Sequence, residues 1–458
     1  MRLGRSIGYA CAAILAMSLV WHEHVSPRAA VTPALFHAAP QHISNRLYRV
    51  LHVRTRPDGK QYGFDALDPL LWTETNYLLE GKSHQQAIAL ADEFLRTHAQ
   101  RQITDPLKRA ILQRDLWAVL DWADQPNEPD QTDLPHQPER RELISRLAPI
   151  VRSLALSAEE LATLPDTYAR ALQLREFPAA YDSANPNRAF LPPELFDAHG
   201  PWVCLGPPSP DLAAPAHDMS FTARSVFLVF ARLPGGRDAT FAYYKQLADM
   251  KTPLFVRMKD PNWPQPMDVW NPQIPQFPEG TEFALVRKLV LPDRDGRLHV
   301  TSILESLQIR HYTDIPHVDP MASRDVNVAQ HFQAPSAMEL SRTLLFSENH
   351  SGLRGITASD PPFLILPVTA NGSDEIEDPF MRTHTYSPFV VCTSCHLGPG
   401  IQSMMSFSFR GNPGEGPVLS PRLAETTPSE ESQKVMQWAQ TQQKWKDLLR
   451  SWTATSLN

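Results

Sequence analysis

Apolar positions recur at helical spacing through the first third of the chain. They fall three or four residues apart over residues 83–99, and Asp105 followed by Pro106 marks the start of a second helix that runs to about Trp122. A third stretch keeps this spacing with Leu143, Ile144, Leu147, Ile150 and Val151. Ser157 and Glu160 then form a capping box, which is typical of a helix start. These signals predict a helical domain over residues 26–180.

From about residue 200 the pattern changes to that of β-strands. The apolar run 225–233 predicts a buried strand, and residues 283–291 and 298–312 predict a hairpin. A short strand over residues 363–368 is expected to close the same sheet. The six prolines of residues 261–280 predict a long ordered loop or arm. We therefore expect a predominantly antiparallel β domain over residues 195–375, with a β-sandwich as its specific form.

The last predicted element is an amphipathic helix that begins after Thr427, with Pro428 and Glu430 completing its start signal. One heptad-spaced stripe carries its large apolar side chains: Val435, Trp438, Trp445, Leu449 and Trp452. We expect this stripe to dock on the protein body, and a binding face for a partner is the alternative. The predicted fold class is α+β, with residues 380–458 as a C-terminal segment that ends in this helix.

Composition limits the functions that this chain can have. Its 43 prolines against 19 glycines indicate many ordered loops and turns. A net charge of -7 provides no basic field, so we expect no nucleic-acid partner. No phosphate-binding loop, hydrolase nucleophile elbow or zinc-protease helix is present.

The N-terminus resembles an export signal. Arg2 and Arg5 precede the apolar run 7–20, which is short for a membrane-spanning helix. Residues 1–25 are therefore predicted to be a signal peptide or an uncleaved membrane anchor. The expected location is periplasmic or secreted, with membrane attachment through this segment as the alternative.

The strongest chemical signal is the pentapeptide Cys392-Thr393-Ser394-Cys395-His396. Composition alone would produce a C-x-x-C-H sequence in roughly one such chain in a thousand, so chance does not explain it. Two thiols at this spacing can bond to the two vinyl groups on one edge of a haem, and the adjacent imidazole then reaches the iron. Ser387, Pro388 and Gly398 predict that the motif lies on a short helix.

This segment resembles the haem-attachment site of c-type cytochromes, and the resemblance covers residues 392–396 only. It implies one covalent haem c on Cys392 and Cys395, with His396 as an axial iron ligand. The candidate sixth ligands are Met404, Met405 and His384; Met436 is a weaker candidate, and an open position is the alternative. The expected function is electron transfer, or service as the haem module of an oxidoreductase. The redox partner and any substrate are unknown from the sequence.

Two other interpretations of the motif remain open. Cys392 and Cys395 would form a disulfide or dithiol in a secreted binding or scaffold protein, or would hold zinc together with His396 and a fourth ligand. Cys204, flanked by apolar residues, is expected to be a buried unreactive thiol. His317 and Asp319, which follow His311, form a weaker candidate metal site.

Overall fold

The N-terminal helices form where capping residues precede apolar stripes. In the computed structural model, the Asp105 carboxylate accepts hydrogen bonds from the backbone N–H groups of Leu107 and Lys108, and Ser157 and Glu160 form the predicted capping box. The helices of this region are α1 (Ile43–His52), α2 (Gly81–Arg96), α3 (Pro106–Ala123), α4 (Gln137–Leu154), α5 (Ala158–Ala162) and α6 (Thr167–Leu174). The helices predicted from residue 83 to the capping box are thus confirmed.

The structure describes residues 34–55, 61–65, 67, 77–124, 136–186, 188–207, 212–221, 224–250, 255–259, 267–271, 273–315, 332–357, 360, 364–365, 385–386, 396, 400–403 and 424–454. Within these ranges, no helix is both long and apolar enough to cross a membrane. The predicted export segment lies outside the described residues.

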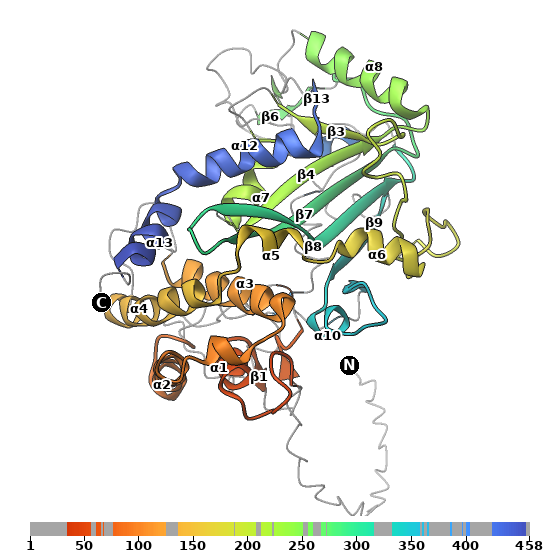
Figure 1. Cartoon of the computed structure of the whole chain (residues 1–458). Helices are drawn as coiled ribbons and strands as arrows, with labels where there is room; N and C mark the ends of the chain where they lie inside the picture. Colours follow the sequence, from red (N-terminus) through yellow and green to blue (C-terminus); the bar gives the residue numbers. More distant parts are fainter. Residues whose placement is uncertain are drawn as a thin grey trace, which may run out of the picture. The chain divides into compact units, whose positions relative to one another are not determined.

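The helices adjoin a seven-stranded antiparallel sheet, as far as the described residues show (Figure 1). Its order is β10 (Leu353–Gly355), β9 (Gln333–Leu340), β8 (Leu298–Tyr312), β7 (Glu282–Pro292), β4 (Ser225–Arg232), β3 (Val203–Gly206) and β13 (Ala424–Glu425). β7 and β8 are the predicted hairpin, and β4 is the predicted buried strand. The α+β class with an antiparallel sheet is therefore confirmed.

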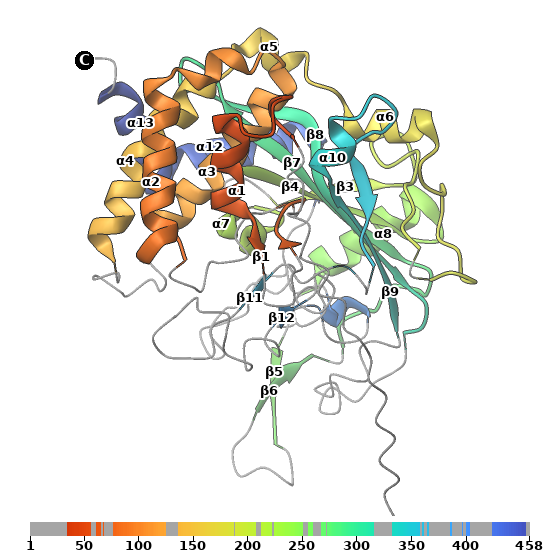
Figure 2. The ribbon, with the colours of Figure 1, turned by 90° about the horizontal axis from the view of Figure 1, so that it is seen from below.

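Residues 226–231 of β4 are all apolar because both faces of the sheet are covered. Alternate residues, such as Leu228 and Phe230, join a first core shared with α1–α4. The intervening residues Phe227 and Val229 join a second core with α8 (Gly236–Asp249). Figure 2 shows α1–α4 grouped on one side of the central strands. α7 (Pro215–Ser220) contacts β4, and its neighbour Ala214 belongs to the second core.

Two predictions in the β region need correction. β11 (Leu364–Ile365), in the predicted strand 363–368, pairs with β12 (Thr385–Tyr386) and does not close the main sheet, because β10 already occupies the edge beside β9. Residues 261–280 contain β6 (Met267–Trp270), which pairs with β5 (Phe255–Met258), so part of the predicted loop is a ribbon. β1 (Arg54–Thr55) and β2 (Gln61–Tyr62) form another short ribbon. The described strands do not confirm a sandwich.

The C-terminal helix is broken where one continuous helix was predicted. Gln442 adopts an extended conformation (φ −71°, ψ 141°), which separates α12 (Pro428–Thr441) from α13 (Gln443–Ala454). The break lets α13 pack against α4, and the Trp445 ring centre also lies 6.0 Å from that of Trp117 on α3. Both tryptophans are buried in the first core, so packing explains the change of direction.

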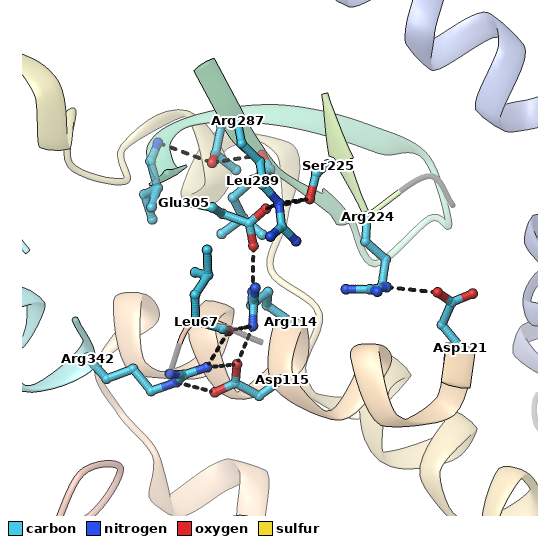
Figure 3. A network of polar contacts seen from close by, with 12 residues as sticks. Leu67, Arg114, Asp115, Asp121, Arg224, Ser225, Arg287, Leu289, Glu305 and Arg342 are labelled. Atoms are coloured by element: carbon cyan, nitrogen blue, oxygen red, sulfur yellow. Dashed lines mark hydrogen bonds and ion pairs between the residues drawn. The ribbon is translucent and has the colours of Figure 1, made fainter. Parts of the chain in front are cut away.

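A network of buried charges joins the helices to the sheet (Figure 3). Asp115 of α3 accepts hydrogen bonds of 2.7 Å and 2.5 Å from Arg342 of α10 (Arg342–Leu345), and one of 3.0 Å from Arg114. Arg114 also donates to Glu305 of β8 at 2.6 Å, and Glu305 pairs with Arg287 of β7 at 2.9 Å. None of these side chains is more than 4% exposed. Each charge therefore depends on its protein partners for stabilisation.

We expect Asp115→Ala to lower the free energy of unfolding by about 3–5 kcal/mol, because it leaves the buried guanidinium groups of Arg114 and Arg342 without this carboxylate. The matched control is Asp249→Ala, which removes a 2.8 Å ion pair with Lys245 between exposed side chains and should have no measurable effect. Urea unfolding followed by circular dichroism measures both. Equal urea midpoints for Asp115→Ala and the unchanged protein would show that the network does not stabilise the fold.

His52 of α1 provides a prediction about pH. Burial, together with Arg342 and Arg114, lowers the pKa of His52 to about 3 against the opposing effect of Asp115. The unfolded chain takes up this proton near pH 6.5, whereas the folded protein resists it. The contribution of His52 to the free energy of unfolding is thus fully present above pH 6.5. It is lost as the pH falls from 6.5 towards 3.

Between pH 7 and pH 5 the unchanged protein should therefore lose about 2 kcal/mol more stability than His52→Leu, which has no group to protonate at this position. Urea unfolding at both pH values gives the difference. His199 is exposed, and His199→Leu should keep the acid sensitivity of the unchanged protein. If His52→Leu is as sensitive to acid as the unchanged protein, the imidazole of His52 does not cause the loss of stability.

Candidate functional site

Of the C-x-x-C-H motif, the structure describes His396. The short helix predicted around the motif lies outside the described residues. So do the other residues predicted to bind the haem: Cys392, Cys395, His384, Met404 and Met405. His396 and the elements that hold it therefore form the described part of the candidate site.

His396 is fixed by hydrogen bonds at its ring and its backbone. Its Nδ1 donates to the backbone carbonyl of Ser403 at 2.7 Å, and its own carbonyl accepts a bond of 2.9 Å from the Gln333 amide on β9. The Ser403 hydroxyl donates to the Gly400 carbonyl at 2.8 Å and also contacts the Tyr312 hydroxyl on β8. With its proton on Nδ1, the His396 ring keeps the Nε2 lone pair for a metal.

Ser403 belongs to a short 3-10 helix (Gly400–Ser403). This helix packs on the face of the sheet that carries the second core, which is called the second face below. Ile401 is buried in the second core, and its backbone N–H donates to the Gln276 side chain at 2.8 Å. Gly400 has a φ of 54°, and a Cβ at this position would collide with Gln276. A glycine is needed here, both for the positive φ and for the close approach.

His396 lines a cavity on this second face, whose empty volume of about 430 Å³ includes space open to solvent. The apolar part of the lining comes mainly from β4 and β7: Val229, Phe283, Ala284 and Leu285, together with Ala214. Three further polar side chains also line it: His217 of α7, and Gln308 and Arg310 of β8. A largely apolar cavity with a few convergent polar groups is the usual form of a cofactor site.

His217 is a site residue that the sequence analysis did not predict. Its ring centre lies 6.3 Å from that of His396, with 12° between the two ring planes, and 5.2 Å from the ring centre of Phe227. No hydrogen bond joins the His217 ring to another residue of the described chain. The sequence around it, Pro215-Ala216-His217-Asp218, carries no ligand motif, and only the fold brings it near His396.

Both imidazoles are neutral at pH 7. Burial lowers the pKa of His217 to about 4, and the cationic Arg287 and Arg310 contribute to this shift. Burial and Arg310 likewise lower the pKa of His396 to about 3, against the opposing effect of its hydrogen bond to Ser403. Metals bind the neutral form of histidine, so this site needs no deprotonation before it coordinates one.

The other described residues that were candidates for binding a metal have other contacts. His311 bonds to Glu282 at 2.9 Å and stacks on Tyr181, while His317 and Asp319 are outside the described residues. Met436 packs against the first core. In the described part of the chain, no cluster of three or more histidine, cysteine or acidic side chains could hold a metal ion.

Cys204 lies in β3 and is 5% exposed, with a free thiol. Burial, with a smaller contribution from Glu431, raises the pKa of this thiol to about 12. A thiol at this pKa is protonated at pH 7 and is a poor nucleophile. The prediction of a buried unreactive cysteine is confirmed.

Comparisons with protein-family models, with curated proteins and with solved structures found no match to this chain.

Proposed function

We propose that this chain is an exported protein that carries one covalent haem c, attached to Cys392 and Cys395 with His396 as an axial ligand. The observation that carries the proposal is the C-x-x-C-H motif, whose histidine lines a largely apolar cavity with Nε2 available for a metal. The proposed role is electron transfer, directly or as the haem module of an oxidoreductase. Bound haem would supply one-electron redox chemistry there.

The side chains that line the cavity have the chemical character expected beside part of a haem, which is a flat apolar ring with two carboxylates on one edge. Val229, Phe283 and Leu285 offer apolar surface for the ring. Arg310 offers a guanidinium group, the usual partner of a carboxylate in a buried site. The donor set, the apolar wall and the cation therefore match the separate parts of a haem.

The cation and the axial histidine are also linked to each other. Arg310 donates a hydrogen bond of 2.6 Å to the Gln333 side-chain oxygen, and the Gln333 amide donates one of 2.9 Å to the His396 carbonyl. β8 and β9 supply Arg310 and Gln333, so adjacent strands fix the spacing of these groups. Outer hydrogen bonds of this kind orient the ligands of a metal.

Covalent haem is attached on the exported side of a bacterial membrane, so the proposal places the mature protein in the periplasm or outside the cell. Attachment to the membrane through residues 1–25 is the alternative. The electron donor and acceptor are not identified.

The test is expression of the full chain in a bacterium that matures c-type cytochromes. The purified protein should be red and should keep its haem on a denaturing gel, whereas Cys392→Ser with Cys395→Ser should lose covalent haem. Cys204→Ala is the matched control, because it removes a cysteine outside the motif and should keep the haem.

A colourless product from that host would contradict the proposal. Thiol titration before and after reduction would then reveal a disulfide between Cys392 and Cys395, and metal analysis would reveal zinc. Equal haem staining in the double cysteine variant and in Cys204→Ala would show that the motif does not attach the haem.

A further inference from the structure

The last described helix, α13, is joined to α12 through one extended residue, Gln442. Its apolar side consists of Trp445, Leu448 and Trp452, which are each no more than 4% exposed and belong to the first core. This burial holds α13 against the helical layer. Because the helix is interrupted at Gln442, α13 can change its position without unwinding α12.

A group of charged side chains lies beside this apolar contact, where α13 meets the C-terminal turn of α3. Lys444 of α13 is 3.6 Å from the Asp121 carboxylate, which also pairs with Arg224 at 3.1 Å. Asp124 follows Asp121 by one helical turn and is the C-cap residue of α3. Asp447 of α13 acts on Asp124 electrostatically. Carboxyl groups from both helices therefore meet at the contact.

The Asp124 carboxyl has less stabilisation than its neighbours. Asp121 has Lys444 and Arg224 as partners, and Asp447 pairs with Arg450. Within the described residues, no hydrogen bond or ion pair reaches the Asp124 side chain. A negative charge on Asp124 therefore lies half-buried beside two other carboxylates, with Lys444 as the cation that opposes them.

The cation that α4 places at the same turn is Arg140, and it is engaged elsewhere. Its guanidinium group donates hydrogen bonds of 3.3 Å and 3.2 Å to the backbone carbonyls of Trp122 and Ala123. These bonds satisfy the end of α3. They leave the charge of Asp124 to the side chains of α3 and α13.

The protonation of Asp124 depends on the position of α13. Burial raises the pKa of Asp124 to about 6, with contributions from Asp447 and Asp121 against the opposing effect of Lys444. When α13 is undocked, water reaches this carboxyl and Asp447 is absent, so we expect the ordinary pKa of about 3.9. Docking stabilised by this group is thus fully present below about pH 4. It is lost as the pH rises to about 6.

We propose that α13 is a pH-controlled arm, which docks firmly on the helical layer when Asp124 is protonated and loosens as this carboxyl ionises. Loosening uncovers the apolar side formed by Trp445, Leu448 and Trp452. The inference does not depend on the haem. The arm also responds to pH in the opposite direction to the whole fold at His52, which loses stability in acid.

The test is hydrogen exchange of the full-length protein at pH 5 and pH 7, followed by mass spectrometry of peptides from residues 443–454. After correction for the intrinsic exchange rate, the protection factor of α13 should fall about tenfold from pH 5 to pH 7. Asp124→Asn has a similar shape without the charge and should show no fall. Asp447→Asn should show a smaller fall, because it lowers the pKa of Asp124. The control Asp238→Asn changes an exposed carboxylate on α8 and should behave as the unchanged protein.

Equal protection of α13 at the two pH values in the unchanged protein would overturn the inference. A tenfold fall that persists in Asp124→Asn would do the same. Peptides from β7 and β8 report unfolding of the whole protein, and an equal loss of protection there would exclude a separate movement of α13. If Asp124→Asn does not fold, an undiminished fall in Asp447→Asn would count against the proposal.

Discussion

The ion network around Asp115 and Glu305 holds the helices and the sheet together, and the rest of the structure depends on it. A buried charge without a partner costs several kcal/mol, so α3 can pack against β7 and β8 only in the position that pairs every charge. Arg114 reaches Glu305 on β8 while Asp115 receives Arg342 from α10 (Figure 3). The network thus favours one arrangement of the helices on the sheet, whereas apolar contacts alone would permit several arrangements.

The network also extends to the face of the sheet that carries the candidate site. Arg287 pairs with Glu305, and its guanidinium group lies 3.8 Å from the ring centre of Phe221. Phe221 follows α7 directly, and its backbone N–H donates to the His217 carbonyl at 3.2 Å. A continuous set of contacts therefore connects α3 to the helix that carries His217. The backbone of α7 is therefore tied to the packing of the two layers.

Local signals in the sequence predicted much of the fold but little of the site. Asp105 and the Ser157 capping box bond to backbone groups within one helical turn, so a short stretch of sequence predicts these helix starts. The apolar run of β4 likewise predicts a strand that is buried on both faces. Arg114 and Asp115 lie in the middle of α3, where charged residues normally face water. Their partners come from β8 and α10, far along the chain, and no local pattern reveals this. The break at Gln442 and the separate pairing of β11 depend on tertiary contacts in the same way.

His396 could be singled out from the sequence because a C-x-x-C-H motif has a fixed spacing, whereas His217 belongs to no motif and only the fold brings it near His396. His396 is held by β8 and β9 through Tyr312 and Gln333, and α7 is held by β4 through Asp218. Hydrogen-bonded strands of one sheet therefore set the gap between the two imidazoles. This gap is a property of the folded sheet, so no spacing in the sequence predicts it.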